Sequence, residues 1–469
     1  MRKFARYFPK YLRIDNFCLI IIIMSNNLDL KKGLDIPLKG VAAQKVVKTV
    51  DPGIVALKPT DFKGLVPRLL VKEGDPVLAG SPVFADKQNP QILFTSPVSG
   101  VVEQVVRGEK RKLLAVLVKA DGKKESVDFG TKVPANADAV KELLLNTGLW
   151  GALIQRPYGV MADPALKPKA IFISSFSTAP LAADTDFVLG DALADIQAGV
   201  NALGKLTDGG VHFSVNKAVY SSTPFHKVEN VISHVVSGKH PAGNVGVQIS
   251  HIAPIRKGET VWTVSLLMVA AIGHVINTGK LDLTRKVAVT GPAAADPAYV
   301  VALPGTPVKE ITSVSEGVRV IGGDVLTGET LGADGYLGFF DNQITLLREG
   351  TERELLGWAK PFRPKVHSSS WCYFSWLTPG KKYDMDTNLH GGPRAFVETK
   401  CFEDVTPMDI FPIYLIKACL AGDIEKMEKF GIYEVLPEDL ALCDYVDPSK
   451  NDIQAIISKG IDLMIKEMA

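Results

Sequence analysis

The sequence predicts a multidomain protein that combines α/β and α+β parts. Three observations point to this fold class. The chain has 469 residues, and at roughly 100–200 residues per domain this length corresponds to about three or four domains. Short strands, alternating strands and helices, further strands and finally helices follow one another along the chain. Hydrophobic residues make up 46% and charged residues 22%, so ordinary globular cores can form and disorder is not indicated.

Residues 1–27 are predicted to be an N-terminal extension ahead of the first domain. The first 23 residues hold five basic side chains and one acid, and they end in FCLIIII, an apolar run of seven. This run is shorter than the ~20 residues of a membrane span and lacks the features of a signal peptide. The sequence therefore favours a misassigned start, with translation beginning at Met24. A degenerate targeting signal and an interfacial anchor are the alternatives.

Residues 28–125 are predicted to form a β domain. LLVKEGDPVLAGSPVF and SPVSGVVEQVVRGEKRKLLAVLV each read as strand, turn and strand, with turns at Gly74-Asp75 and Arg107-Gly108. The phrases VKEGDPVLAGSP and SPVSGVV resemble motifs of biotinyl and lipoyl carrier domains. Two similar halves packed as a biotinyl/lipoyl-like β-hammerhead are therefore expected.

Lys87 is the candidate carrier lysine of this domain. It precedes Pro97 by ten residues, and QNP intrudes between them. In a carrier domain the lysine lies at the tip of a tight hairpin between symmetric halves, and this insertion displaces Lys87 from such a tip. The sequence favours an ordinary surface lysine in a hairpin loop, and modification of Lys87 by lipoyl or biotin is the alternative.

Residues 126–283 are predicted to form a Rossmann-like α/β domain. ADAVKELLLNTGLWGALIQ has a helical pattern, and DFVLGDALADIQAGVNALGKL reads as a helix between the buried strands KAIFISSF and GGVHFSV. This alternation predicts a parallel sheet. VWTVSLLMVAAIGHVI is the most apolar stretch, but its 16 residues fit a buried helix better than a span.

A glycine-rich phosphate loop is absent from the α/β segment. A nucleotide domain needs a turn of bare backbone N–H groups that leads into a helix. Neither G-x-G-x-x-G nor G-x-x-x-x-G-K-[ST] occurs in the sequence. SGKHPAGNVG has other glycine spacings, and GGDVLTGETLGADG, which lacks lysine, predicts hairpin turns.

The remaining chain divides into a strand-rich and a helical part. Residues 284–348 hold four strand-like runs and one short helix, 307–311, which predicts a small β-grasp-like domain. Residues 349–469 predict a C-terminal helical domain. Asp423 is placed to cap a helix that ends at Gly431. The last helix carries an apolar stripe at spacings of three and four, which favours packing on its own domain over partner docking.

Metal, nucleic-acid and hydrolase chemistry find no support in the residue pattern. The five cysteines include no C-x-x-C pair, so a zinc ribbon or a complete iron–sulfur run is not available. The formal charge is +2 and no basic run alternates with aromatic residues. H-E-x-x-H and G-x-S-x-G do not occur. Cys443 is expected to be a core thiol.

Nine phrases from about residue 28 to the C-terminus resemble one family. They are KKGLDIPLKG, FADKQNP, SPVSGVVEQVVRGEKR, GLWGALIQRPYG, HPAGNVGVQISH, GYLGFFDNQITLLREG, GGPRAF, PMDIFP and EDLALCDYV followed by PSK. In this order they resemble the A subunit of the Na+-translocating NADH:quinone oxidoreductase (Na+-NQR). That family is similar to the flavoprotein subunit of complex I and to the Rnf C subunit.

The resemblance implies a scaffold from which flavin and cluster chemistry has been removed. GLWGALIQRPYG stands where the flavoprotein relatives carry a glycine-rich loop, and Trp150, Leu153 and Ile154 would block the close backbone approach of a phosphate. CDYVDP stands where those relatives carry cluster cysteines. No flavin, metal or other cofactor is therefore expected on this subunit. NADH, flavins, iron–sulfur and Na+ belong to the whole complex.

The implied function is quinone binding on the cytoplasmic face of the bacterial inner membrane. The subunit would be peripheral in a six-subunit complex, next to the membrane-embedded B subunit, and would contribute to quinone reduction coupled to Na+ export. A quinone site needs an apolar slot, an aromatic wall and donors to the carbonyls. Phe62 and Lys63 in the first domain, and Arg156 and Tyr158 in the replaced loop, are the candidates. A structural turn is the alternative for Arg156–Tyr158.

Two other function classes stay open at this point. The alternatives are a carrier protein modified on Lys87 and a stand-alone NADH dehydrogenase with flavin in the α/β domain. No residue is expected to be catalytic in the isolated chain.

Overall fold

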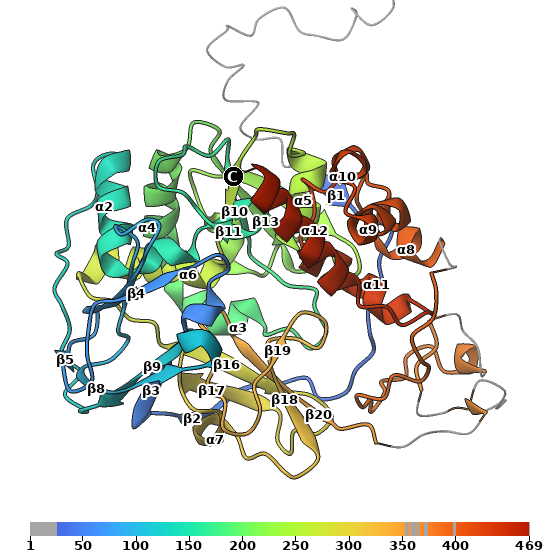
Figure 1. Cartoon of the computed structure of the whole chain (residues 1–469), viewed down its shortest axis with the longest axis horizontal. Helices are drawn as coiled ribbons and strands as arrows, with labels where there is room; N and C mark the ends of the chain where they lie inside the picture. The colour runs from blue at the N-terminus through green and yellow to red at the C-terminus, as the bar shows by residue number, and fades with distance from the viewer. Residues whose placement is uncertain are drawn as a thin grey trace, which may run out of the picture.

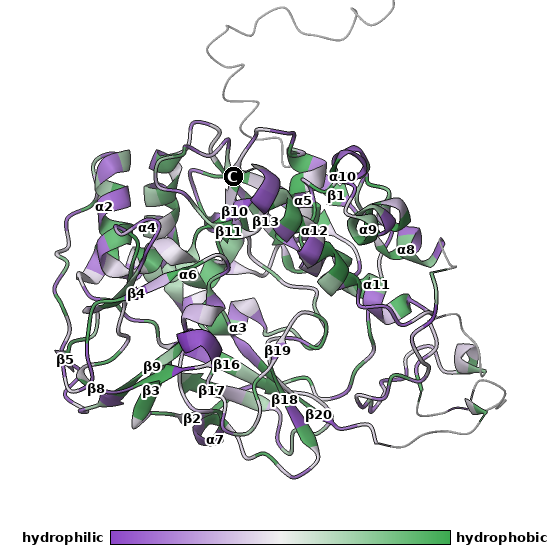
Figure 2. Cartoon of the chain, in the orientation of Figure 1, coloured by the Kyte–Doolittle hydropathy of each residue, from purple (hydrophilic) through white to green (hydrophobic). Residues whose placement is uncertain are grey.

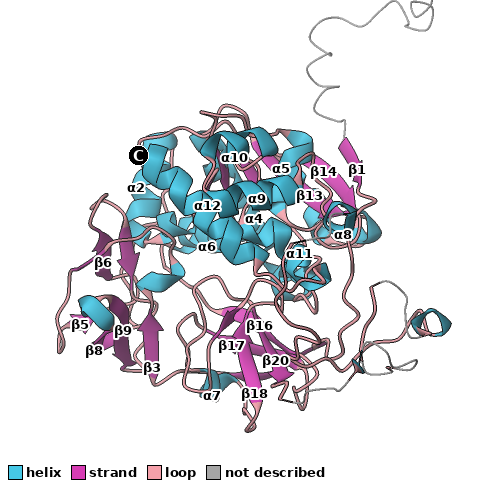
Figure 3. Cartoon of the chain, turned by 45° about the vertical axis from the view of Figure 1, so that its right-hand side comes forward, coloured by secondary structure: helices cyan, strands magenta, loops and turns pink. Residues whose placement is uncertain are grey.

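The computed structural model describes residues 26–351, 356–357, 363, 366–369, 374–396 and 400–468. The predicted start at Met24 lies outside these residues. The α/β domain and the C-terminal helices occupy the upper part of the molecule in Figure 1, and the β-rich parts lie below them. Figure 3 shows the same division, with helices gathered in one half and most strands in the other. The mixed α/β multidomain class is confirmed.

A seven-stranded sheet forms the centre of the α/β domain. Its middle strands are parallel, as predicted, because helices connect them across both faces. One edge differs from the prediction, since two short strands after the first helix add in antiparallel orientation. In sheet order the strands are β1 (Asn26–Asp29), β14 (Ile232–Ser237), β13 (Val211–Asn216), β12 (Ile171–Ser174), β15 (Val261–Thr263), β10 (Ile154–Arg156) and β11 (Val160–Met161).

Alternate side chains of β12 pack on the two faces of this sheet. Ile171 and Ile173 belong to the core that includes Ile196 and Val200 of α4 (Leu193–Leu203). Phe172 points to the opposite core, with Ile249 of α5 (Val245–Ile252). The apolar run 261–276 contains β15 followed by α6 (Leu266–Thr278), which is almost entirely buried. A strand covered on both faces has no polar side, which explains the apolar composition of KAIFISSF.

The two longest predicted helices of this domain are shorter in the structure. The first, α2 (Ala137–Thr147), is capped by the Asn136 side chain and ends because Gly148 adopts φ 77°. A 3-10 turn and then β10 follow it. The second breaks into α3 (Thr185–Leu189), a 3-10 turn and α4. In the first case helical periodicity continued across a glycine with a left-handed backbone, and in the second it continued across Leu189, which leaves the helical conformation at φ −123° and ψ 2°.

The first β domain consists of two small antiparallel sheets. The turns near Gly74 and Gly108 lie where the sequence predicts them. Lys87 is exposed one residue after β6 ends, in the loop to β7, which agrees with a surface lysine in a hairpin loop. The sheets are ordered β3 (Ile54–Leu57), β9 (Leu113–Ala120), β8 (Gly100–Arg107), β5 (Pro76–Val77), and β4 (Pro67–Leu69), β6 (Pro82–Asp86), β7 (Leu93–Thr95).

The third part is a six-stranded sheet with one short helix, α7 (Val308–Ile311), close to its predicted position. Its core includes Val287, Val300 and Leu346. In sheet order the strands are β19 (Glu329–Thr330), β18 (Val318–Gly322), β20 (Gln343–Arg348), β16 (Arg285–Thr290), β17 (Ala298–Ala302) and β2 (Ala43–Thr49). The hammerhead, Rossmann-like and β-grasp-like labels stay predictions.

Two strands at the start of the chain pair with sheets outside the predicted β domain: β1 spans the predicted boundary between 1–27 and 28–125, and β2 lies within 28–125. β1 pairs in parallel with β14 of the α/β sheet. β2 pairs in parallel with β17 of the six-stranded sheet. Pairing partners more than a hundred residues away leave no local pattern, so a linear division could not place these strands.

The C-terminal helices pack around a core of their own. Asp423 caps α10 (Ile424–Phe430) and Gly431 ends it with φ 105°, as predicted. Ile453, Ile457 and Ile461 of α12 (Ile453–Met468) are fully buried in this core, and Figure 2 shows α12 with one polar and one apolar side. The other helices are α8 (Lys400–Val405), α9 (Pro412–Ala421) and α11 (Ala441–Val446). Within the described residues, no helix combines the length and apolarity that crossing a membrane requires.

Candidate functional site

The four predicted quinone residues come from two segments that meet in the fold. Lys63 Nζ donates to the Tyr158 carbonyl oxygen at 3.2 Å. The same ammonium lies 3.6 Å from Asp462 Oδ1 on α12. The β domain, the α/β domain and the C-terminal helices therefore meet at Lys63. Tyr158 itself adopts φ 85° and its ring lies 6.4 Å from that of Tyr433.

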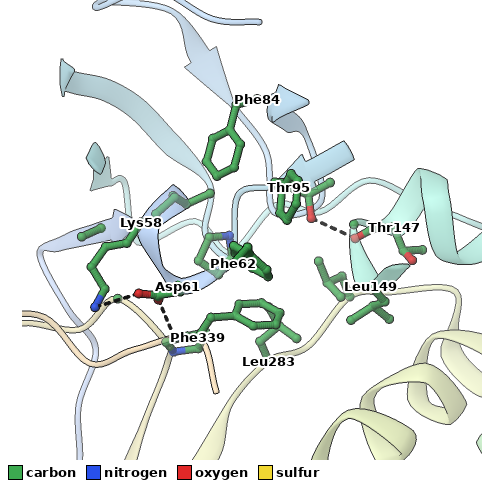
Figure 4. Close-up of a pocket in the computed structure, with 17 residues that line it drawn as sticks. Lys58, Asp61, Phe62, Phe84, Thr95, Thr147, Leu149, Leu283 and Phe339 are labelled. Carbon is green, nitrogen blue, oxygen red and sulfur yellow. Dashed lines mark hydrogen bonds and ion pairs between the residues drawn. The ribbon is translucent and has the colours of Figure 1, made fainter. Parts of the chain in front are cut away.

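Phe62 lies in a small aromatic cavity between the β domain and the two parts that follow it. The cavity has a volume of about 40 Å³. The Phe62 ring centroid is 4.5 Å from that of Phe94 and 4.9 Å from that of Phe339. Figure 4 shows Phe62 between Phe84 and Thr95 on one side and Phe339 and Leu283 on the other. Three segments far apart in the sequence thus build one aromatic wall.

A buried ion pair forms the polar end of the cavity. Lys58 Nζ lies 3.0 Å from Asp61 Oδ1, and both side chains are largely buried. Asp61 also accepts the Phe339 backbone N–H at 2.7 Å (Figure 4). Burial raises the pKa of Asp61 despite Lys58, and burial likewise raises the pKa of nearby Asp341. The site therefore offers an ammonium and a carboxyl that holds its proton more readily than an exposed one.

Local backbone geometry positions this polar end. Pro59 opens the 3-10 turn Pro59–Asp61, and its fixed φ suits the first position of a helical turn. Gly305 packs against β3, the strand before this turn, where an added Cβ would lie 2.2 Å from the Ala56 carbonyl oxygen. Only glycine allows the two backbones to approach this closely.

Arg156 does not line the cavity. Its side chain is 2% exposed, with Nη1 2.7 Å from Asp439 Oδ2 and Nη2 2.5 Å from Glu438 Oε1. Burial alone lowers the pKa of Arg156, but the two carboxylates together raise it. Arg156 Nε and Asp439 Oδ1 have no hydrogen-bond partner among the described residues. Arg156 thus joins the α/β domain to the C-terminal helices.

Bulky buried side chains fill the segment GLWGALIQRPYG. Trp150 and Leu153 are fully buried. The Trp150 ring lies 5.5 Å from that of Trp262, and its Nε1 donates to the Ala162 carbonyl oxygen at 2.7 Å. A carboxylate already faces the first turn of α5, because a Cβ on Gly246 would lie 2.3 Å from Asp439 Oδ2. Arg156 Nη1 would lie 2.2 Å from the same Cβ, so the ion pair of Arg156 and Asp439 fills the space that a phosphate would need there.

Cys443 lies in the core of the C-terminal helices. Cys443 is fully buried, its Sγ lies 3.7 Å from Thr406 Oγ1, and burial raises its pKa to about 12. It is a core thiol, as predicted. No three His, Cys, Asp or Glu side chains of the described residues gather as metal ligands would. Cys18 and Cys372 lie outside those residues.

Sequence reasoning proposed Phe62 as a quinone contact, which stays a prediction, and did not predict the residues that surround it. Phe339 and Phe340 stand in the phrase GYLGFFDNQ, which the sequence marks only as a family phrase. Lys58 and Asp61 lie in the same turn as Phe62, and their spacing of three residues on a short helix is a local signal for an ion pair. Phe94 and Phe339 lie far apart in the sequence, so no local pattern predicts that both contact Phe62.

Comparisons with known proteins point to one family along most of the chain. Sequence models match residues 28–121 as "NqrA N-terminal barrel-sandwich hybrid domain", 135–281 as "NqrA second alpha/beta domain" and 286–332 as "NQRA C-terminal domain". The A subunit of the Na(+)-translocating NADH-quinone reductase of Rhodopirellula baltica is 36% identical, covering 93% of this chain and 98% of its own. The chain belongs to this NqrA family.

Other members of the NqrA family are similarly related. The Neisseria meningitidis serogroup A protein is 35% identical over 94% of this chain and 100% of its own, and the Yersinia pestis protein is 36% identical over 92% and 97%. Among solved structures, an NAD+-reducing [NiFe]-hydrogenase in the H2-reduced state covers 71% of this chain and 62% of its own, at 11% identity and a TM-score of 0.36. That likeness is too weak to carry an argument.

Proposed function

We propose that this chain serves as the A subunit of a Na+-translocating NADH-quinone reductase. The support is the family membership over nearly the whole chain and the relatives' shared name. In this role the chain belongs to an oxidoreductase complex and works with other subunits, the membrane-embedded B subunit among them, at the cytoplasmic face of the membrane. Its part in the complex is to bind and position a quinone.

The aromatic cavity around Phe62 supports this role best. A quinone ring is flat and apolar on its faces and carries two carbonyl acceptors at its edge. Phe62, Phe94 and Phe339 supply faces and edges for stacking. Lys58 Nζ supplies a donor at the buried polar end. An apolar slot with a few converging polar groups is the usual form of a small-molecule site.

Entry of a quinone ring requires the aromatic side chains to move apart. The cavity of about 40 Å³ is much smaller than the roughly 300–1,000 Å³ of typical ligand sites. Phe62 and Phe339 come from different parts of the fold, and Asp61 joins them through the Phe339 N–H. Phe62 and Phe94 belong to the large hydrophobic core and Phe339 packs against it, so opening the slot requires the Phe339 segment to move away from this core.

The proposal assigns no flavin or metal to this subunit. Its support is the packing of Trp150 and Leu153 and the carboxylate of Asp439 at the first turn of α5. Electrons and Na+ are consequently handled by other subunits. The purified chain is expected to lack a flavin absorption band, and tightly bound FMN would overturn this part.

Photo-crosslinking in the assembled complex tests the quinone site. A photoreactive quinone analogue is expected to label peptides of the Phe62 cavity, and Phe62→Ala is expected to reduce labelling by roughly tenfold, as loss of a stacked aromatic predicts. Phe411→Ala is the matched control, because Phe411 is 57% exposed at the start of α9. Equal labelling of the wild type and both variants would overturn the assignment of the cavity.

A further inference from the structure

A second and larger cavity lies between α6 and the start of β16. Its volume is about 300 Å³. One wall is apolar and comes from α6, with Leu267, Ala270 and Ala271. Val188 of α3 and Val301 of β17 extend this apolar surface. The cavity therefore has the room and the apolar contact area for a small ligand with a hydrocarbon part.

A buried cation borders the same cavity. Arg285, the first residue of β16, is 3% exposed. Its Nε donates to the Leu283 carbonyl oxygen at 3.3 Å, and its Nη1 donates to the Phe339 carbonyl oxygen at 2.7 Å. A longer contact of 3.4 Å joins Nη1 to the Asp341 carbonyl oxygen. These acceptors are all neutral, and Nη2 has no hydrogen-bond partner among the described residues.

The guanidinium of Arg285 is therefore buried without a carboxylate in contact with it in the described part of the chain. A buried charge is unfavourable unless it is paired. Burial lowers the pKa of Arg285 to about 10, although the nearby Asp341 opposes this shift. The Asp341 carboxyl accepts the Gly338 N–H at 2.9 Å, and burial raises its own pKa. An anion beside Nη2 would supply both the charge and the acceptor that Arg285 lacks.

The two acids on the cavity wall have donors of their own. Asp195 Oδ2 lies 3.2 Å from His274 Nδ1, and Asp195 Oδ1 accepts the Asn277 side-chain amide at 2.7 Å. Asp282 Oδ1 accepts the Thr284 N–H at 2.8 Å. These carboxylates repel an anion, and they repel one with two charges more strongly than one with a single charge. The wall therefore favours a singly charged ligand.

We propose that the larger cavity binds a medium-chain fatty acid. Its carboxylate accepts a hydrogen bond from Arg285 Nη2, and its hydrocarbon chain lies against the apolar wall of α6. Lys286 adds a second positive charge at the edge of the cavity. The inference goes beyond the proposed function and does not depend on it, because it uses neither the aromatic cavity nor a quinone.

Calorimetric titration of the purified full chain tests the inference with three ligands. Octanoate carries both the charge and the chain, butanoate has the same charge on a shorter chain, and 1-octanol has the same chain without the charge. The wild type is expected to bind octanoate at least about tenfold more tightly than either of the others. Each buried methylene adds about fourfold in affinity, and the alcohol leaves the charge of Arg285 unpaired.

Two variants fill the cavity and test where the chain binds. Ala271→Leu places a larger side chain on the α6 wall, and Ala192→Leu does so from the segment before α4. Each is expected to weaken octanoate binding at least about tenfold, because the chain then loses its apolar contacts. Ala194→Leu is the matched control and is expected to bind as the wild type does, because Ala194 is exposed and lines neither cavity.

A third variant tests where the carboxylate binds. Arg285→Gln is expected to bind octanoate no more tightly than 1-octanol, since the neutral amide removes the charge. Arg68→Gln is its control and is expected to keep the preference of the wild type, because Arg68 is exposed and lines neither cavity. Circular dichroism shows beforehand which variants are folded.

Three outcomes would overturn the inference. In the first, the wild type does not bind octanoate. In the second, the wild type binds 1-octanol as tightly as octanoate. In the third, both filled variants keep the octanoate affinity of the wild type. If Arg285→Gln does not fold, the ligand series in the wild type and the filled variants still decides, because it compares charge and chain separately.

Discussion

Arg156 donates to Asp439 at 2.7 Å across 283 residues of sequence. Both side chains are buried, and Glu438 completes the contact on the second guanidinium nitrogen. The pair holds β10, the strand next to the edge strand β11 of the α/β sheet, against the 3-10 turn Pro437–Leu440 of the C-terminal part.

Breaking this pair is expected to destabilise the protein strongly. Arg156→Ala leaves the Asp439 carboxylate buried without its cation, which costs about 3–5 kcal/mol. The double variant Arg156→Met, Asp439→Leu removes both charges and is expected to recover much of that loss. Urea unfolding, monitored by circular dichroism, measures the unfolding free energy of both variants and of the wild type.

The matched control is an exposed ion pair. Lys45 and Asp296 lie 3.0 Å apart with side chains 52% and 67% exposed, so Lys45→Ala is expected to cost less than about 1 kcal/mol. If Arg156→Ala is as mild as Lys45→Ala, the buried pair does not hold the two parts together.

Gly246→Ala is expected to disturb the same contact from the side of α5. Its Cβ would lie 2.2 Å from Arg156 Nη1 and 2.3 Å from Asp439 Oδ2. Overpacking of this kind costs about 1–3 kcal/mol. Gly53→Ala is the control, because an added Cβ there meets nothing within 4 Å. Thermal unfolding of the two variants checks the prediction, and equal melting temperatures would refute it.

A stacked histidine pair is expected to make stability fall in mild acid. His212 Nδ1 lies 2.9 Å from His234 Nε2 on neighbouring strands. Burial lowers the pKa of both histidines to about 4. For His212, repulsion from the neighbouring His234 lowers the pKa further in the same direction. The stability of the neutral pair is complete above the unfolded pKa of about 6.5. It is lost as pH falls from there toward about 4, on the order of 2 kcal/mol in all.

Unfolding free energies at a series of pH values measure this slope. His212→Gln is expected to flatten the curve between about pH 4 and 6.5, whereas the control His226→Gln, at an exposed position, keeps it. An unchanged slope in His212→Gln would show that other groups cause the acid sensitivity.

Lys87 is expected to be unmodified. It lies at the start of the β6–β7 loop, and its backbone N–H is bonded to the Val66 carbonyl oxygen at 2.7 Å. A carrier lysine must reach a ligase at a hairpin tip, and this position is set back from the tip at Asn89. Intact mass spectrometry of the chain purified from its native complex is expected to show no lipoyl or biotinyl group, and finding one would restore the carrier hypothesis.

Local sequence patterns predicted the elements that depend on contacts between residues close together in the chain. The Asp423 cap, the Gly431 stop and the buried stripe of α12 follow from contacts three and four residues apart. The order of strand-rich, α/β, strand-rich and helical parts follows from composition and periodicity. Phe62 was proposed as a quinone contact because it is an aromatic residue next to Lys63 in the first domain, and its role stays a prediction.

Tertiary structure alone decided which distant segments meet. The pairing of β1 with β14 and β2 with β17, the contact of Phe62 with Phe94 and Phe339, and the ion pair of Arg156 with Asp439 join residues tens to hundreds of positions apart. Such contacts form because the folded core brings complementary surfaces together and excludes water from them. No residue in the sequence marks its distant partner, so a cavity built from three segments becomes visible only after the chain has folded.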